Sequence, residues 1–153
     1  MHGRSMRVVK GNLLDLAYKG EFDVIVHGCN CFHMMGAGIA RQIALAFPEA
    51  HRADRSSAYG DPAKLGSISI GHVAGPVSEF DVVNAYTQFE GGANLDYDAL
   101  RKAFAEVRWR YFGRRIAYPR IGAGIGGGDW GKIASIINDE LVGENHTLVE
   151  FTG

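Results

Sequence analysis

The sequence predicts an α/β fold with a mixed, mostly parallel sheet of about six strands and helices on both faces. Short apolar runs alternate along the chain with about four segments of helical periodicity, as a parallel sheet requires. Glycine, at 21 residues, is concentrated in "MMGAGIA", "FEGGAN" and "GAGIGGGDWG", and the first and last of these stretches lie where a strand leads into a helix. The length of 153 residues suits one core. We therefore expect a single domain over 6–153, and interpret residues 1–5 as a possible expression scar.

The first half of the chain opens with a predicted strand over 6–14. The apolar run "FDVIVHG" at 22–28 predicts a strand buried on both faces. Apolar residues at spacings of three and four predict a helix within 37–50, and Pro48 stops the pattern. The polar segment 51–66 is interpreted as a short helix and a loop.

The second half of the chain also alternates between predicted strands and predicted helices. Asn94 or Asp96 is expected to cap the clearest helix of the chain, and Asp129 another. The predicted strands lie at 67–74, 80–88, 114–119 and 146–151, and the predicted helices at 94–112 and 130–141.

Composition limits the classes of partner. The net charge is −1 at pH 7 without a run of like charges, so no basic nucleic-acid-binding patch is visible. We expect nucleic acid only as a modified substrate. No apolar stretch reaches the roughly 18 residues of a membrane span, and no signal peptide is visible. Cys29 and Cys31 are interpreted as reduced thiols. We expect a cytoplasmic monomer without membrane contact.

The two glycine-rich junctions, "MMGAGIA" at 34–40 and "IGAGIGGGDW" at 121–130, are the candidate binding loops. Each follows a predicted strand and precedes a predicted helix, so both are expected at the carboxyl edge of the sheet. Bare backbone there lets N–H groups and a helix N-terminus approach a phosphate. One such loop suits a monophosphate, whereas two facing loops suggest a diphosphate.

Other interpretations of these motifs remain open. Residues 122–127 match G-x-G-x-x-G, but a dinucleotide-binding fold places that motif after its first strand. Residues 126–132 match G-x-x-x-x-G-K, but Ile133 stands where a P-loop has Ser or Thr. The glycines would also be explained if they only permit close packing between strands and helices.

A zinc site is a further alternative, because His27, Cys29, Cys31 and His33 alternate along the chain. In an extended strand at about 3.3 Å per residue the outer two would lie roughly 20 Å apart, and zinc ligands lie within about 2.3 Å of the metal. Only a sharp turn would bring them together, so we expect no metal.

Four segments together resemble the macrodomain family, the ADP-ribose-binding module. The more specific likeness is to its branch of bacterial, phage and fungal proteins related to ADP-ribose-1''-phosphate phosphatases. The resemblance implies a three-layer α/β/α sandwich, ADP-ribose or a 1''-derivative as the small-molecule ligand, and no cofactor. The segments are "KGNLLD", "DVIVHGCNCFHMMGAGIARQI", "VVNAYTQ" and "YPRIGAGIGGGDW".

The resemblance assigns ligand-binding roles to particular residues. Asn12 and Leu13 fall where the family holds the adenine, with Asn12 in place of an acidic residue; its amide oxygen can still accept a hydrogen bond. Asn30 would face the distal ribose. The two phosphate loops would be formed by Gly36, Ala37, Gly38 and Ile39, and by Gly122, Ala123, Gly124, Ile125, Gly126 and Gly127.

The catalytic candidates are Asn30, His33 and Asp129. Gly126 stands where a related branch has a catalytic Asp, so a covalent lysine–aspartate mechanism is not supported. A water positioned by Asn30 and the substrate's phosphates is the alternative, with His33 or Asp129 as a general base. The competing interpretations are a helix cap for Asp129 and an exposed loop position for His33.

Four further polar residues lie near these motifs. His27 replaces the first Asn of the family's N-A-A-N stretch, and its place at a buried strand end favours a hydrogen-bonded structural histidine. Thr87 and Gln88 end a strand, so they either face the ligand or lie at the strand edge near solvent; the same choice applies to Asn84.

The resulting functional hypothesis is ADP-ribose binding with hydrolysis of a 1''-linked group, foremost the phosphate of ADP-ribose-1''-phosphate. A non-catalytic ADP-ribose reader is the second hypothesis. An ADP-ribosyl hydrolase acting on modified protein or nucleic acid is the third.

Overall fold

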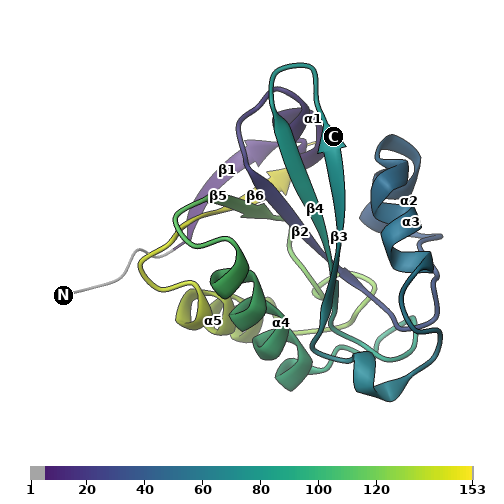
Figure 1. The fold of residues 1–153 in the computed structure, drawn as a ribbon. Coiled ribbons are helices and arrows are strands. Elements are labelled where there is room, and N and C mark those ends of the chain that lie inside the picture. Colours follow the sequence, from purple (N-terminus) through teal and green to yellow (C-terminus); the bar gives the residue numbers. More distant parts are fainter. Residues whose placement is uncertain (1–5, 153) are drawn as a thin grey trace.

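The computed structural model describes residues 6–152, which form one six-stranded sheet between two layers of helices (Figure 1). The possible expression scar at 1–5 lies outside the described residues. The elements are β1 (Arg7–Gly11), α1 (Leu13–Tyr18), β2 (Val24–Cys29), α2 (Gly38–Ala46), α3 (Pro48–Arg55), the short 3₁₀ helix η1 (Pro62–Lys64), β3 (Ile68–Ala74), β4 (Glu79–Tyr86), α4 (Tyr97–Arg110), β5 (Arg115–Tyr118), α5 (Trp130–Glu140) and β6 (Asn145–Phe151).

The sheet has the strand order β1-β6-β5-β2-β4-β3. Every neighbouring pair is parallel except β3 and β4, which are antiparallel. The predicted mixed, mostly parallel sheet is therefore confirmed. In the centre, Val24 of β2 lies opposite Asp81 of β4 and Ile116 of β5, and the first four residues of β2 are buried.

Each face of the sheet has its own apolar core. The helices α4 and α5 cover one face with a core that includes Phe104 and Ile137, and the helices α1, α2 and α3 cover the other with Ile43 and Phe47 (Figure 1). This arrangement is the three-layer α/β/α sandwich that the resemblance implies.

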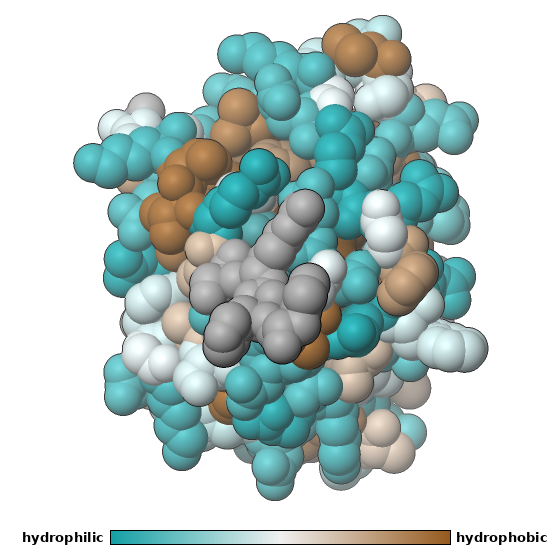
Figure 2. All heavy atoms as spheres, turned by 90° about the vertical axis from the view of Figure 1, so that its left-hand side faces the viewer, coloured by the Kyte–Doolittle hydropathy of each residue, from teal (hydrophilic) through white to brown (hydrophobic). Residues whose placement is uncertain are grey.

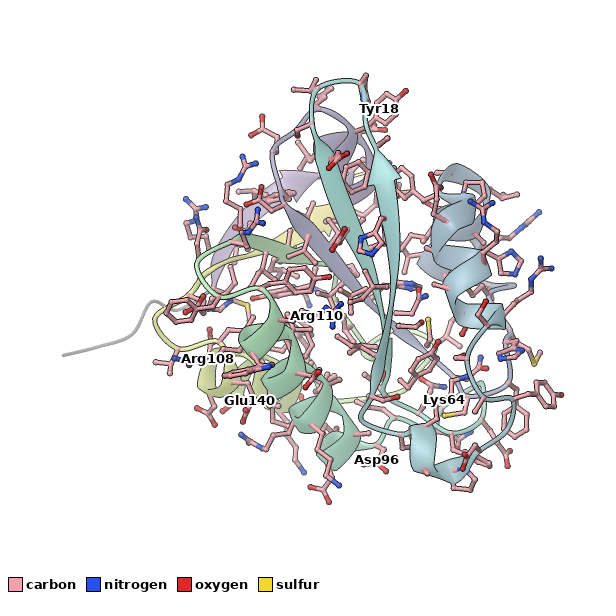
Figure 3. The ribbon with its side chains drawn as sticks, viewed as in Figure 1. Tyr18, Lys64, Asp96, Arg108, Arg110 and Glu140 are labelled. Atoms are coloured by element: carbon pink, nitrogen blue, oxygen red, sulfur yellow. The ribbon has the colours of Figure 1, made fainter. Side chains whose placement is uncertain are left out.

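Polar contacts fix the start of α4 and join α4 to α5. Asp96 is the cap of α4, since its Oδ1 accepts a hydrogen bond from the N–H of Ala99 at 3.0 Å. Arg108 of α4 donates to the backbone oxygen of Glu140 at the end of α5, at 3.3 Å (Figure 3).

Two predicted elements are divided differently in the structure, and the ends of the other predicted strands and helices at 67–151 and 22–28 lie within three residues of the observed ones. The strand predicted over 6–14 ends at Gly11, because Asn12 caps α1 and turns Leu13 and Leu14 into its first turn. The helical pattern at 37–50 divides into α2 and α3 at Phe47, which precedes Pro48 and has a φ of −127° and a ψ of 79°, outside the helical region. The structure thus has five α-helices among the described residues where about four were expected.

The surface over α4, α5 and the edge strand β1 is largely hydrophilic, with apolar side chains in separate groups (Figure 2). Within 6–152, no helix combines the length and the apolar character needed to cross a bilayer.

Candidate functional site

Two adjoining cavities form a continuous cleft at the carboxyl edge of the sheet. The first cavity has a volume of about 620 Å³ and the second about 560 Å³. Residues at the ends of β1 and β6 line the first cavity, and residues at the ends of β2 and β4 line the second. Both cavities share Gly38, Ile39, Pro119, Arg120 and Gly124.

The first glycine loop, residues 36–39, opens α2 toward this cleft. No side chain caps α2 among the described residues, and the N–H groups of Gly38, Ile39 and Ala40 donate no hydrogen bond there. Gly38 has a φ of +57°, which a residue with a side chain rarely adopts. The helix therefore presents free donors and its positive dipole end to the shared part of the cleft.

The second glycine loop, residues 122–127, presents a matching set of donors. Its shape is fixed by hydrogen bonds from the Gly128 N–H to the Gly122 oxygen at 2.7 Å and from the Gly127 N–H to the Gly124 oxygen at 3.1 Å. The exposed N–H groups of Gly124 and Ile125 donate to none of the described residues. Gly124 lines both cavities, as Gly38 and Ile39 at the start of α2 do, and Ile125 lines the second.

Some of these glycines permit close packing, and others border open space in the cleft. A Cβ at Gly128 would lie 2.4 Å from Leu95, and one at Gly127 would lie 2.7 Å from Ala93, so these two permit close packing. A Cβ at Gly36 or Gly124 would meet nothing within 4 Å. Packing alone therefore does not explain why glycine stands at the cleft-facing positions.

The two loops approach each other across the cleft. A Cβ on Gly38 would lie 3.4 Å from Cδ1 of Ile125, and the Ile125 side chain is exposed. An anion between the loops would thus meet backbone donors from both sides.

The far end of the second cavity is built from the loops after β2 and β4. Asn30 shapes its own loop, since its Nδ2 donates to the Met34 oxygen at 3.0 Å and its Oδ1 accepts from the Phe32 N–H at 2.9 Å. Gln88 donates through Nε2 to the Glu90 and Gly92 oxygens at 2.8 and 2.9 Å. Both residues line the second cavity.

Thr87 at this end of the second cavity has a hydroxyl that is unpartnered within 6–152. Its side chain is 1% exposed and lines the second cavity, yet its Oγ1 has no hydrogen-bond partner among the described residues. A buried hydroxyl without a partner is costly. Rotation of the side chain toward the cleft would let a ligand or a water supply the missing partner.

Titratable side chains are scarce in the second cavity. Cys29 and Arg120 are the two that line it in the described part of the chain. Burial raises the pKa of the Cys29 thiol well above its ordinary value, so the thiol is protonated at neutral pH. Arg120 pairs with Glu150 at 2.8 Å, and its guanidinium lies 5.5 Å from the centre of the Trp130 ring.

The structure does not bring His33 or Asp129 into either cavity. The Nε2 of His33 lies 2.7 Å from the Ser57 oxygen, on the side of the loop after α3. Asp129 caps α5, with its Oδ1 accepting from the Gly131 N–H at 3.0 Å. Their catalytic roles stay predictions, and this geometry gives them no direct support.

His27 is a buried structural residue. Its Nε2 lies 2.6 Å from Oδ1 of Asn84, whose Nδ2 donates to the Ala50 oxygen at 2.9 Å. Burial lowers the pKa of His27 to about 4, against a smaller upward effect of the Asn84 hydrogen bond. Asn84 is buried and does not line the cleft, whereas Thr87 and Gln88 do.

The residues considered as an alternative zinc site do not gather in one place. His33 turns toward Ser57, while His27 and Cys29 contact each other in the core, with 3.6 Å between Cys29 Sγ and His27 Nε2. Over 6–152, no three His, Cys, Asp or Glu side chains gather as a metal site would need.

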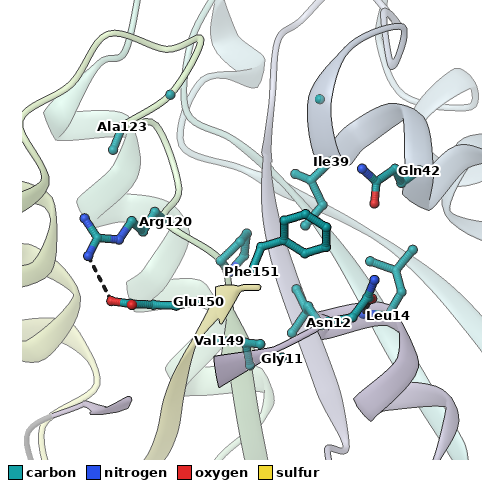
Figure 4. A pocket seen from close by; sticks show the side chains of 14 residues that line it. Gly11, Asn12, Leu14, Ile39, Gln42, Arg120, Ala123, Val149, Glu150 and Phe151 are labelled. Atoms are coloured by element: carbon teal, nitrogen blue, oxygen red, sulfur yellow. Dashed lines mark hydrogen bonds and ion pairs between the residues drawn. The ribbon is translucent and has the colours of Figure 1, made fainter. Parts of the chain in front are cut away.

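The first cavity contains Asn12 and Ile39, which were predicted, and residues that sequence reasoning missed, among them Leu14, Gln42, Arg120, Glu150 and Phe151. Figure 4 shows the Phe151 ring in the middle, with Asn12, Leu14, Ile39 and Gln42 on one side and the Arg120–Glu150 pair on the other. Phe151 is the last residue of the last strand. The rule that ligands bind beyond the carboxyl ends of parallel strands would have found it.

A three-layer α/β/α sandwich with two glycine loops facing a cleft at the carboxyl edge defines a class of ligand-binding domain. The family model of the Macro domain matches residues 26–137. The chain belongs to the Macro domain family.

Individual proteins agree with this assignment. The chain is 39% identical over 140 residues to the "Uncharacterized 17.5 kDa protein in tk-vs intergenic region" of Enterobacteria phage T4, covering 87% of this chain and 88% of that protein. It is 26% identical to the DNA ADP-ribosyl glycohydrolase of Thermus aquaticus over 89% of this chain, but spans only 38% of that protein's length. The phage relative agrees with the expected bacterial and phage branch.

The solved structures show the same fold. The macrodomain of Thermus aquaticus DarG superposes with a TM-score of 0.73, at 24% identity and with 97% of each chain covered. Thermosipho africanus DarTG in complex with ADP-ribose gives 0.71 at 12% identity, over 99% of this chain and 44% of that one.

Proposed function

We propose that the cleft binds ADP-ribose and that the protein hydrolyses a group linked to C1'' of the distal ribose, with ADP-ribose-1''-phosphate as substrate. The observation that carries the proposal is the pair of facing donor sets on Gly38–Ala40 and Gly124–Ile125. Gly38, Ile39 and Gly124 line both cavities, so a diphosphate at the junction would meet donors from both loops.

The cavities on either side then take the two nucleoside-like halves of the ligand. The aromatic ring of Phe151 and the aliphatic side chains of Leu14 and Ile39 suit a planar base in the first cavity (Figure 4). Asn30 and the unpartnered hydroxyl of Thr87 suit a ribose in the second cavity. The ligand named for the Thermosipho africanus structure supports the same choice.

Hydrolysis would depend on the substrate's own phosphate. No Asp, Glu or His among the described residues lines the second cavity. Water would attack the 1''-phosphate and give ADP-ribose and inorganic phosphate. Because the second pKa of a phosphate monoester is about 6, the rate is expected to follow ionisation of the substrate near that pH.

A second function, an ADP-ribose reader without turnover, is favoured by the same scarcity of acids and bases. The similarity to a DNA ADP-ribosyl glycohydrolase favours a third function, removal of ADP-ribose from modified nucleic acid. Release of inorganic phosphate from ADP-ribose-1''-phosphate separates the first two functions. Loss of label from ADP-ribosylated DNA or protein tests the third.

The first experiment is a calorimetric titration with ADP-ribose, with AMP and ribose-5-phosphate as controls. Saturable binding that is much tighter for ADP-ribose than for AMP supports the proposal, and equal affinities contradict the role of the two loops. His33→Ala and Asp129→Asn test the alternative bases. Loss of hydrolysis with ADP-ribose affinity retained would restore a catalytic role for that residue.

A further inference from the structure

Asn12 presents a hydrogen-bond donor to the first cavity. Its Oδ1 accepts the N–H groups of Leu14 at 3.0 Å and Asp15 at 3.1 Å, as the cap of α1. An amide oxygen has two lone pairs, so both are engaged. With the amide flipped, Nδ2 of Asn12 would face the backbone N–H groups of Leu14 and Asp15, and all of these groups are donors. The Nδ2 group, which donates to none of the described residues, is the part of Asn12 left for a ligand.

This corrects the sequence-based expectation that the amide oxygen of Asn12 accepts a hydrogen bond from the adenine amino group. The oxygen is already used within the protein. A carboxylate at this position would differ, because its second oxygen would remain free as an acceptor.

We propose that Asn12 recognises the base by donating a hydrogen bond, so that the first cavity prefers a purine with an oxo group to one with an amino group at the edge facing Asn12. The inference rests on the proposed function, which places a base against Phe151. An oxo group accepts the Nδ2 donor. An amino group would set donor against donor and leave Nδ2 only a ring nitrogen of the purine as acceptor.

The other polar side chains of the first cavity do not reverse this preference. The Gln42 side chain is exposed and makes no hydrogen bond to the described residues, so it can turn either its oxygen or its nitrogen to a base. Glu150 is paired with Arg120 at 2.8 Å on the opposite side of the Phe151 ring (Figure 4). Asn12 differs from both because two backbone hydrogen bonds fix its orientation toward the cavity.

The test compares ADP with IDP by calorimetric titration of the wild-type protein and of Asn12→Asp. The two nucleotides share the ribose and the diphosphate and differ at the purine edge. Asp is as good a helix cap as Asn, so the variant keeps the start of α1. We expect IDP to bind more tightly than ADP in the wild type, and Asn12→Asp to shift the affinity ratio toward ADP by about tenfold.

Asn138→Asp is the matched control. Asn138 accepts a hydrogen bond from the Met6 N–H through Oδ1 and lies on α5, outside both cavities, so the same amide-to-carboxylate change should leave the ratio unchanged. Tighter binding of ADP than IDP by the wild type overturns the inference, as does an Asn12→Asp ratio equal to that of the wild type. Failure of ADP-ribose itself to bind overturns the proposed function, which the other outcomes leave standing.

Discussion

His27 illustrates how one residue's chemistry follows from its neighbours. The Nδ2 of Asn84 donates to Ala50 and Ser69, so Oδ1 of Asn84 is the atom that faces His27 and must accept. The neutral ring therefore carries its proton on Nε2 and leaves Nδ1 bare, 3.8 Å from Sγ of Cys29. Burial disfavours a second proton on the ring and outweighs the upward effect of the Asn84 hydrogen bond, so the pKa of His27 falls to about 4.

This depressed pKa predicts acid destabilisation. In the unfolded chain the pKa of His27 is 6.5, so between about pH 6.5 and 4 the unfolded state binds more protons than the folded state. The stability is full above this window and falls as the pH drops through it, by about 3 kcal/mol in all. Urea unfolding from about pH 7.5 to 4.5 measures the loss.

The comparison for that measurement is His27→Asn, which removes the titrating group and should flatten the pH dependence over the same range. His51→Asn on α3 makes the same change at a partly exposed position and should keep the wild-type slope. Parallel curves for wild type and His27→Asn would contradict the assignment.

Thr87→Val is expected to lower the affinity for ADP-ribose without lowering the stability of the fold. The substitution removes a buried hydroxyl that has no partner among the described residues, so the free energy of unfolding should stay equal or rise. Affinity for ADP-ribose should fall by about three- to tenfold, because the hydroxyl then cannot bond to the ligand. Thr87→Ser keeps the hydroxyl and should bind as the wild type does. Equal affinity in all three proteins would remove Thr87 from the site.

At the scale of elements, Gly124→Glu tests the two-loop cleft. The added side chain enters open space at a position without positive φ, so the fold should tolerate it. Its carboxylate would lie beside donors meant for an anion, and binding of ADP-ribose should weaken by at least about a hundredfold. Ala105→Glu adds the same charge on the exposed side of α4 and should bind normally. Wild-type affinity for Gly124→Glu, measured by calorimetry, would refute the cleft.

Some helix boundaries can be predicted from sequence patterns alone. The stop at Pro48 and the cap at Asp96 follow from backbone chemistry that one residue carries. The start of α1 does not, because Leu13 and Leu14 continue an apolar run and only the hydrogen bonds of Asn12 reveal a helix there. The same bonds decide which end of Asn12 meets a ligand, and the sequence contains no sign of them.

At the scale of the whole molecule, the parallel sheet explains what could be predicted about the site. Parallel strands deliver their carboxyl ends to one edge, so the two glycine loops were expected together and lie together. The direction in which a side chain points could not be predicted from the order of strands and loops. His33 follows β2 in the sequence, but a φ of +57° helps turn it to the Ser57 oxygen and away from the cleft.

A ligand that bridges both loops should stabilise the whole fold. The first loop begins α2 on one face of the sheet, and the second precedes α5 on the other, so a diphosphate between them links the two outer layers. At a hundredfold excess over its dissociation constant, ADP-ribose should add about 2.7 kcal/mol and raise the melting temperature by roughly 5–10 °C.

AMP at the same concentration lacks the second phosphate and the distal ribose, so its shift in thermal denaturation should be much smaller. Gly124→Glu should melt near the wild-type temperature when free and lose most of the shift with ADP-ribose. An equal shift for AMP and ADP-ribose would mean that the affinity resides in the first cavity alone. The free N–H groups of Gly124 and Ile125 would then have no part in binding.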